Sequence, residues 1–148
     1  MSKKILVLGT GAQGSTVAQR MDEEANVSEI ICADYDKKAV DELVMILKKA
    51  KGTIVDANDV DSIIKAAEGV DLIVNALPIA FAPKVLDAAL AVKANYQDFA
   101  ATDVLDAWWP KCVKIMYEEY GKKFAEIGKM AIIGTGSAPG MMCVATKS

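Results

Sequence analysis

The N-terminal part of the chain holds a glycine pattern that can bind an anion through the backbone alone. The segment Gly9–Gly14 has glycine at its first, third and sixth positions, directly follows the apolar run Ile5–Leu8, and opens a helical pattern. In this setting Gly9 makes a tight turn, Gly11 lets a pyrophosphate approach the backbone, and Gly14 lets the helix pack on the strand. Free N–H groups at the helix start then hold the phosphates without any Lys or Arg. The pattern predicts a dinucleotide site.

A carboxylate at a suitable distance from these glycines fits the sugar of such a ligand. Asp34 lies twenty residues beyond Gly14, at the end of the second apolar run, where it can accept hydrogen bonds from both hydroxyls of an adenosine ribose. A 2′-phosphate there would meet a like charge, at a cost of up to about 4 kcal/mol per unit-charge pair. The sequence therefore predicts NAD as the cofactor, with NADP less favoured, although the nearby Lys37 and Lys38 soften that preference.

Further candidates follow the third and fourth apolar runs, because ligands of open parallel sheets bind outside the carboxyl ends of the strands. Asp56 and Ala57 are placed to border the adenine, and Asn75–Pro78 lies where the ligand enters. The alternative is that both groups are only turn and helix-entry residues. The predicted cofactor-binding residues are Gly9, Gly11, Ala12, Gln13, Gly14, Asp34, Tyr35, Asp56, Ala57, Asn75, Ala76, Leu77 and Pro78.

No catalytic residue is assigned. The chain has no His, which excludes a Ser-His-Asp triad and removes the commonest general base at neutral pH. Five residues at and beyond the fifth apolar run are interpreted as solvated loop acids and a packing Trp pair, rather than as substrate contacts: Asp98, Asp103, Asp106, Trp108 and Trp109.

The cysteines indicate neither a disulfide framework nor a metal site. Cys32, Cys112 and Cys143 are odd in number, widely spaced and without any C-x-x-C pair, which argues against both. They are interpreted as small buried apolar side chains. A reducing, cytoplasmic location is the simplest expectation.

The elements that must position these residues alternate regularly. Short apolar runs are separated by stretches of helical period, as in repeated strand–helix–strand units with a parallel sheet. Asp36 and Asn58 are expected to cap the helices after the second and third strands. The predicted strands are Lys4–Leu8, Glu29–Ala33, Thr53–Val55, Asp71–Ala76, Tyr96–Phe99 and Met130–Gly134. About six strands predict a doubly wound α/β sheet of the Rossmann type.

A last amphipathic helix is predicted after Pro110. One stripe of this helix is apolar and is expected to be buried as core, not used as a ligand cage. The stripe consists of Val113, Met116, Tyr117, Tyr120, Phe124 and Ile127.

Composition limits the partners. A chain of 148 residues that is 53% hydrophobic can fold as one compact domain without a metal or disulfide. Its net charge of −3 offers no positive field for nucleic acid or an anionic membrane. No run reaches the roughly 18 apolar residues of a membrane helix. We therefore expect a small-molecule ligand, with no nucleic acid and no membrane as partners.

The C-terminal residues differ from the rest. The segment Gly136–Gly140 breaks regular structure, and Met141–Val144 then adds apolar side chains shortly before the sequence stops. We expect residues 1–135 to form the NAD-binding domain and residues 136–148 to begin a second, substrate or catalytic domain that is missing here.

The same residues resemble the nucleotide-binding half of the saccharopine dehydrogenase-like enzymes, and most closely the lysine 6-dehydrogenase branch. The resemblance implies an NAD(P)-dependent oxidoreductase acting on an amino acid at a C–N bond, with a second domain that supplies most substrate contacts and a homodimer interface. The acid at Asp34 looks more like the NAD-linked branch than the NADPH-linked saccharopine reductases. The segments that carry the resemblance are Gly9–Gly14, Ala33–Asp34, Val55–Ala57, Asp71–Pro78 and Ala138–Gly140.

The main alternative is a non-enzyme, the nucleotide-sensing regulatory module of potassium channels and transporters, which shares the glycine turn and the acid after the second strand. Pro78, the Trp108–Pro110 loop and Pro139–Gly140 favour the enzyme, because a sensing module needs none of them. A short-chain dehydrogenase is set aside, since no Tyr in the chain has Lys four positions later.

Overall fold

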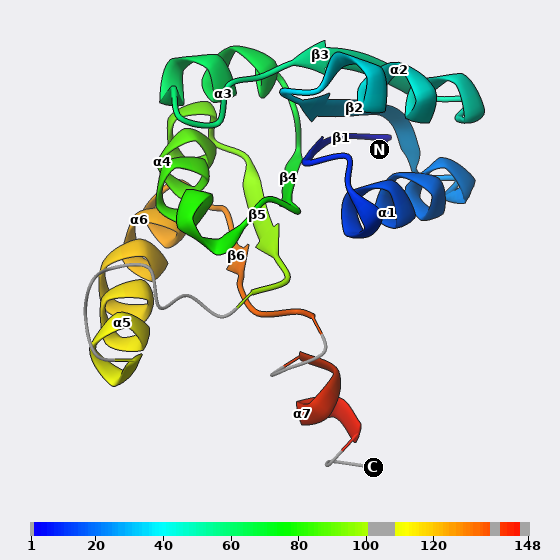
Figure 1. The fold of residues 1–148 in the computed structure, drawn as a ribbon. Coiled ribbons are helices and arrows are strands. Elements are labelled where there is room, and N and C mark those ends of the chain that lie inside the picture. The colour runs from blue at the N-terminus through cyan, green and yellow to red at the C-terminus, as the bar shows by residue number, and fades with distance from the viewer. Residues whose placement is uncertain (1, 101–108, 137–139, 146–148) are drawn as a thin grey trace.

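The strands form one parallel sheet in the computed structural model, which describes residues 2–100, 109–136 and 140–145 (Figure 1). Within these residues the sheet has six strands in the order β3-β2-β1-β4-β5-β6. The chain therefore steps outward from β1 in one direction, returns, and steps outward from β4 in the other, which confirms the predicted doubly wound fold. The strands are β1 (Lys3–Leu8), β2 (Val27–Asp34), β3 (Ala50–Ile54), β4 (Leu72–Asn75), β5 (Asn95–Asp98) and β6 (Ala131–Ile132).

The helices lie on both faces of this sheet. The helices α1 and α2 cover one face beside β1–β3, and the other face carries α3, α4, α5 and α6 (Figure 1). This division follows from the right-handed crossover of each parallel unit, because the direction of travel reverses between the two halves. The helical segments are α1 (Ala12–Glu23), α2 (Lys37–Ile46), α3 (Val60–Ala66), η1 (Ile79–Phe81), α4 (Ala82–Val92), α5 (Trp109–Ile115), η2 (Met116–Tyr120), α6 (Gly121–Glu126) and α7 (Met142–Ala145).

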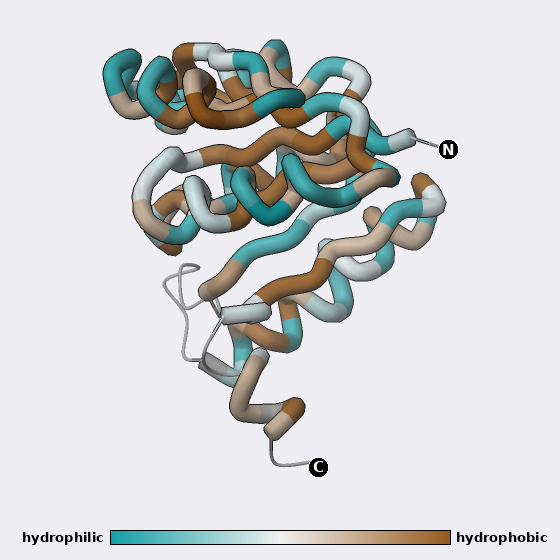
Figure 2. Tube along the Cα trace, turned by 90° about the vertical axis from the view of Figure 1, so that its right-hand side faces the viewer, coloured by the Kyte–Doolittle hydropathy of each residue, from teal (hydrophilic) through white to brown (hydrophobic). Residues whose placement is uncertain are grey.

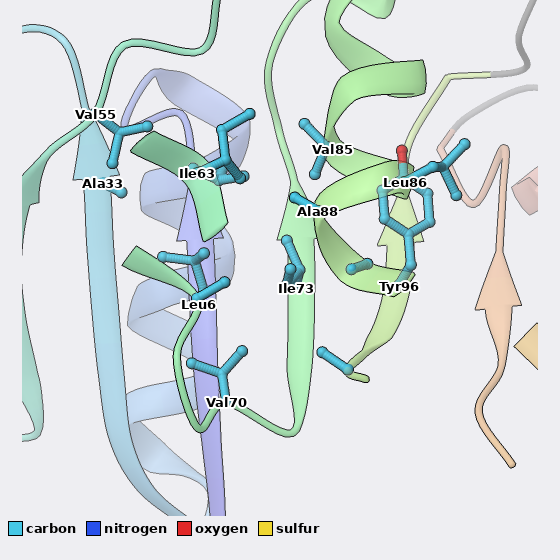
Figure 3. Close-up of a cluster of buried hydrophobic side chains, with 14 of the residues drawn as sticks. Leu6, Ala33, Val55, Ile63, Val70, Ile73, Val85, Leu86, Ala88 and Tyr96 are labelled. Atoms are coloured by element: carbon cyan, nitrogen blue, oxygen red, sulfur yellow. The ribbon is translucent and has the colours of Figure 1, made fainter. Parts of the chain in front are cut away.

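Strand β1 is buried on both sides, as a central parallel strand requires. Leu6 and Leu8 belong to the larger apolar cluster, under α3 and α4 (Figure 3). Ile5 and Val7, which point the other way, belong to a second cluster that includes Ala18 of α1. Figure 2 shows the hydrophobic residues running along the strands, with hydrophilic residues on the outer helices. The first glycine of the predicted motif thus directly follows a strand whose last four residues are buried.

Some predicted boundaries were wrong. Strand β3 begins at Ala50, before the predicted Thr53, and β6 is only two residues long. Asp36 caps α2 as predicted, because its side chain accepts the N–H groups of Lys38 and Ala39. The cap of α3 is Asp59, not Asn58, and its side chain accepts the N–H of Asp61.

The predicted apolar stripe after Pro110 is only partly buried. Met116 and Phe124 lie in the core, but Tyr117 is 84% exposed and Val113 is 39% exposed. Tyr117 lies in η2, a π-helical turn over Met116–Tyr120, whose wider turn departs from the 3.6-residue period. Val113 lies before this turn, in α5. The exposed Tyr117 corrects the prediction for this helix.

Neither a membrane-spanning helix nor a metal-binding cluster of side chains occurs among the described residues. No helix among them is long and apolar enough to span a bilayer, and no group of three or more acidic, Cys or His side chains among them could hold a metal ion. Cys32 and Cys112 are buried as predicted, whereas the side chain of Cys143 lies outside the described part.

Candidate dinucleotide-binding site

In the turn between β1 and α1, two of the three glycines are required by backbone conformation and packing within the protein. Gly9 has φ +92°, and a Cβ there would lie 2.9 Å from the carbonyl oxygen of Ala76. A Cβ on Gly14 would overlap the carbonyl oxygen of Gly9. A Cβ on Gly11 would meet no protein atom within 4 Å. Packing therefore explains Gly9 and Gly14, while Gly11 leaves open space where a ligand can approach.

The start of α1 suits an anion. Its N-cap is Gly11, which has no side-chain capping hydrogen bond, and its first turn contains no acidic residue. Ala12 and Gln13 are exposed, and no described side chain caps the start of this 12-residue helix. A helix start of this kind is where phosphate groups bind.

Asp34 ends β2 beside the glycine turn and is fixed by several hydrogen bonds. Its Oδ2 accepts from the backbone N–H of Thr10 at 2.7 Å and from the Thr10 hydroxyl at 3.0 Å. Its Oδ1 accepts from the N–H of Asp36 at 3.1 Å. Burial alone would raise the pKa of Asp34, but these hydrogen bonds outweigh it and hold the pKa below its usual range. The carboxylate is therefore charged at neutral pH and held in one orientation next to the turn.

A cavity of about 580 Å³ opens beside this carboxylate, at the carboxyl ends of β1–β3. It is mostly apolar in its lining, with Leu8, Val55 and Phe81 among the walls, as expected for a pocket that takes a flat ring. Six of the predicted site residues share this cavity: Asp34, Tyr35, Asp56, Ala57, Leu77 and Pro78.

The lysines beside Asp34 are turned to other partners. Lys37 forms an ion pair with Asp41, and Lys38 with Glu42, both along the exposed side of α2. Such exposed pairs are weak, at about 0.3–0.5 kcal/mol each, so they bias the lysines without locking them. Asp56 is exposed, and its Oδ1 accepts the N–H of Asn58 at 2.8 Å, which makes it partly a turn residue.

A second, much smaller cavity of about 30 Å³ lies between the start of α1 and the ends of β4 and β5. Gln13, Asn75 and Leu77 line it together with Asp98. Ala76 supports the turn from behind, because its oxygen approaches Gly9. The structure thus brings all thirteen predicted residues to one edge of the sheet, around the glycine turn and these two cavities.

Asp98 corrects the prediction of a solvated loop acid. It is 2% exposed, its Oδ2 accepts from the Tyr96 hydroxyl at 2.8 Å, and its Oδ1 accepts from the Gly134 N–H at 2.7 Å. Burial raises the pKa of Asp98, against hydrogen bonds that favour the charged form. Asp103, Asp106 and Trp108 lie outside the described residues, as does the side chain of Trp109.

Two residues of this edge, Thr10 and Tyr96, were not among the predicted site residues. Thr10 occupies a variable position of the glycine motif, and only its contacts with Asp34 reveal its role. Tyr96 was read only as the start of a strand, yet its hydroxyl joins Asn75 to Asp98. A usable signal was the polar content of β5, since Asn95–Asp98 contains no aliphatic residue.

The fold and this edge together define a dinucleotide-binding domain of the Rossmann type. The comparison with protein families is specific: the family model of the saccharopine dehydrogenase NADP-binding domain matches residues 5–132. The chain therefore belongs to that family, as the sequence resemblance predicted.

Similar proteins agree with this assignment. A carboxyaminopropylagmatine dehydrogenase from Synechocystis is 30% identical over 97% of the chain, which spans 36% of that protein. The saccharopine dehydrogenase (L-Glu forming) of Saccharomyces cerevisiae has the same fold at a TM-score of 0.77 and 18% identity, over 98% of this chain and 30% of its own. The Citrobacter triphenylmethane reductase complexed with NADP(H) follows at 0.63 and 18%, over 87% of this chain and 48% of its own. The chain thus spans about a third of the length of the Synechocystis and Saccharomyces dehydrogenases.

Proposed function

We propose that this chain is the cofactor-binding domain of an NAD-dependent dehydrogenase that acts on an amino acid or amino-acid conjugate at a C–N bond. The observation that carries the proposal is the meeting of three features at the carboxyl edge of the sheet: an uncapped helix start, a charged carboxylate and an apolar cavity. Each suits one part of a dinucleotide, namely phosphate, ribose and adenine.

Separate groups of residues bind the pyrophosphate, the ribose and the adenine of the ligand. The N–H groups at the start of α1 hold the pyrophosphate, with Gly11 leaving the space for it. Asp34 accepts the ribose hydroxyls through the lone pairs that Thr10 and Asp36 do not use. The cavity from Ala33 to Pro78 takes the adenine. A bound dinucleotide would supply a hydride acceptor at its nicotinamide ring, while the start of α1 and Asp34 would hold the ligand in place.

The substrate class rests on family membership and on the names of the relatives. The family is named for saccharopine dehydrogenase, and the Synechocystis relative is named for a substrate that carries a carboxyl and an amino group. Membership in this family favours a dehydrogenase over the nucleotide-sensing module of channels and transporters. The proposal leaves the individual substrate, lysine, saccharopine or another amine, to experiment.

The cofactor preference rests on Asp34. A fixed charged carboxylate at the ribose accepts two hydroxyls well but repels a 2′-phosphate, and the nearest lysines are paired along α2. The family description names NADP, so NAD over NADP is a specific proposal about this chain.

The remaining parts of the proposal concern the longer protein. We propose that residues 1–135 form the cofactor domain and that residues 136–148 begin a second domain, which supplies most substrate contacts and a homodimer interface. The proposed location is the cytoplasm, where cysteines such as the buried Cys32 stay reduced.

The test is calorimetric titration of the 148-residue chain with NAD and NADP side by side. We expect both to bind, with NAD at least about fivefold tighter, from about 1 kcal/mol of repulsion between the 2′-phosphate and Asp34. No binding of either would reject the proposed function. Lysine- or saccharopine-dependent formation of NADH by this chain should be absent, and measurable turnover would contradict the proposed role of a second domain.

A further inference from the structure

A buried chain of hydrogen bonds joins three strands at the half of the site that the adenosine does not use. Asn75 ends β4 and donates from Nδ2 to the hydroxyl of Tyr96 in β5 at 3.0 Å. That hydroxyl donates to Oδ2 of Asp98 at 2.8 Å. Oδ1 of Asp98 accepts from the N–H of Gly134, just beyond β6, at 2.7 Å. The three side chains are only 1–3% exposed.

Burying Asp98 in this network costs folding free energy. No Lys or Arg forms a salt bridge with Asp98 among the described residues, and an acid buried without a cation is costly. An apolar residue at the end of β5 would pack without that cost. Since every donor and acceptor in the chain of hydrogen bonds is satisfied, the network specifies one geometry rather than adding much net stability.

The network reaches the glycine turn through Asn75. Oδ1 of Asn75 accepts the N–H of Leu77 at 3.1 Å, which fixes the bend of the chain after β4. Ala76 and Leu77 are the residues against which Gly9 packs, since a Cβ there would lie 3.1 Å from Cδ2 of Leu77. Leu77 also lines both cavities. Asp98 therefore acts on the wall between the two halves of the site.

At its other end the network fastens the segment that leaves β6. Besides the Gly134 bond, the carbonyl oxygen of Asp98 accepts from the N–H of Thr135 at 3.0 Å and from its hydroxyl at 2.6 Å. Gly136 then donates to the carbonyl of Phe99 at 3.2 Å. The carboxyl ends of β5 and β6 are thus held together beyond the two residues of β6 itself.

From this geometry we propose that Asp98, acting through Tyr96, Asn75 and Gly134, is the positioning residue for the nicotinamide half of the bound dinucleotide. The inference rests on the proposed function and deepens it. With the adenosine over β2 and β3 and the pyrophosphate at α1, the rest of the ligand extends over the ends of β4, β5 and β6, where this network sets the shape of the surface.

The experiment compares a whole dinucleotide with its adenosine half. NADH and ADP-ribose are titrated into the 148-residue chain by calorimetry, for the wild type, Asp98→Asn and Tyr96→Phe. Asp98→Asn replaces the carboxylate with an amide that cannot accept on both sides, and Tyr96→Phe removes the hydroxyl that joins Asn75 to Asp98. Both variants keep the approximate size of the side chain. We expect NADH to bind about tenfold more weakly to each variant, the scale of a hydrogen bond to a charged group, and ADP-ribose to bind within about twofold of wild type.

The matched control is Asn95→Ala, at the opposite end of β5. Asn95 also links strands, because its Oδ1 accepts the N–H of Met130 and its Nδ2 donates to the carbonyl of Asp71. Its substitution should leave the ratio of NADH to ADP-ribose affinity unchanged. If Asp98→Asn does not fold, the Tyr96→Phe variant decides the question.

The outcomes separate the two proposals. An equal loss of both ligands in the Asp98 and Tyr96 variants, or no loss of either, would overturn the positioning role while leaving the proposed function intact. Failure of the wild type to bind either ligand would reject the proposed function, and this inference with it.

Discussion

Replacing Asp34 should change which dinucleotide the chain prefers. The carboxylate is charged and accepts three hydrogen bonds from Thr10 and Asp36. These bonds fix its orientation beside the glycine turn without a ligand. Asp34→Asn keeps the shape and an acceptor for the Thr10 N–H but removes the charge. We expect this variant to lose affinity for NAD and to gain affinity for NADP.

The size of the effect follows from two contributions. Weaker acceptance of the ribose hydroxyls should reduce NAD binding by about 1 kcal/mol, the usual net contribution of one hydrogen bond. Relief of the like charge is worth up to about 4 kcal/mol for each unit pair, and about 1 kcal/mol after solvent screening at this half-buried site. Together, about 2 kcal/mol corresponds to roughly a 30-fold change in the ratio of NAD to NADP affinity.

The assay is calorimetric titration of both cofactors into the wild type and the variant. The control is Asp36→Asn, which makes the same change in net charge two residues away and keeps a side chain able to cap α2. It should shift the ratio by less than about threefold, because the screened charge lies farther from the ribose. An unchanged ratio in a folded Asp34→Asn variant would refute the ribose contact assigned to this carboxylate.

Three further predictions concern the glycine turn, the stability in acid and Asp98. Gly14→Ala should lower the free energy of unfolding in urea by about 1–3 kcal/mol, because its Cβ overlaps the Gly9 carbonyl. Gly11→Ala should stay within about 0.5 kcal/mol yet weaken NAD binding, and equal effects at both glycines would contradict the assigned roles. Below about pH 4 the protein should lose stability as the pH falls, because folding lowers the pKa of four acids, whose contributions are present above their unfolded pKa. Asp98 acts oppositely, since its raised pKa gives a contribution that is present in acid and is lost as the pH rises through its folded pKa. Asp98→Asn should therefore remove this loss of stability above about pH 4, and an unchanged pH dependence in urea titrations would argue against the burial of Asp98. The four acids are Asp22, Glu29, Asp34 and Asp71.

The alternation of elements and the position of the glycine motif could be predicted because both depend on local patterns. The strand before Gly9 and the helix after it were correct, and so was the place of Asp34 at the end of β2. Each depends on residues close in sequence, whose period and spacing carry the information. Right-handed crossovers then decide which face of the sheet each connecting helix covers.

The burial of Asp98 could not be predicted in the same way. Its partner Gly134 lies 36 residues further along the chain, and a carboxylate at a strand end usually lies in solvent. The exposure of Tyr117 was missed for a related reason, since Tyr117 lies in a single π-helical turn whose period differs from the 3.6 residues on which the apolar stripe was based. Long-range partners and small changes of register are what a pattern of residue types does not contain.

The double use of Asp34 has a consequence for anyone who wishes to re-engineer cofactor choice. The carboxylate that faces the sugar is also the acceptor for the backbone N–H and hydroxyl of Thr10, a residue only 7% exposed. Replacing Asp34 with a small or basic side chain would therefore leave a buried donor of Thr10 without an acceptor. This should lower the free energy of unfolding by about 1–3 kcal/mol and loosen the turn. A redesign should therefore pair the exchange at Asp34 with a new hydrogen-bond acceptor near Thr10. In a library that varies Asp34 alone, variants that bind the new cofactor well would also be destabilised, and selection would remove them.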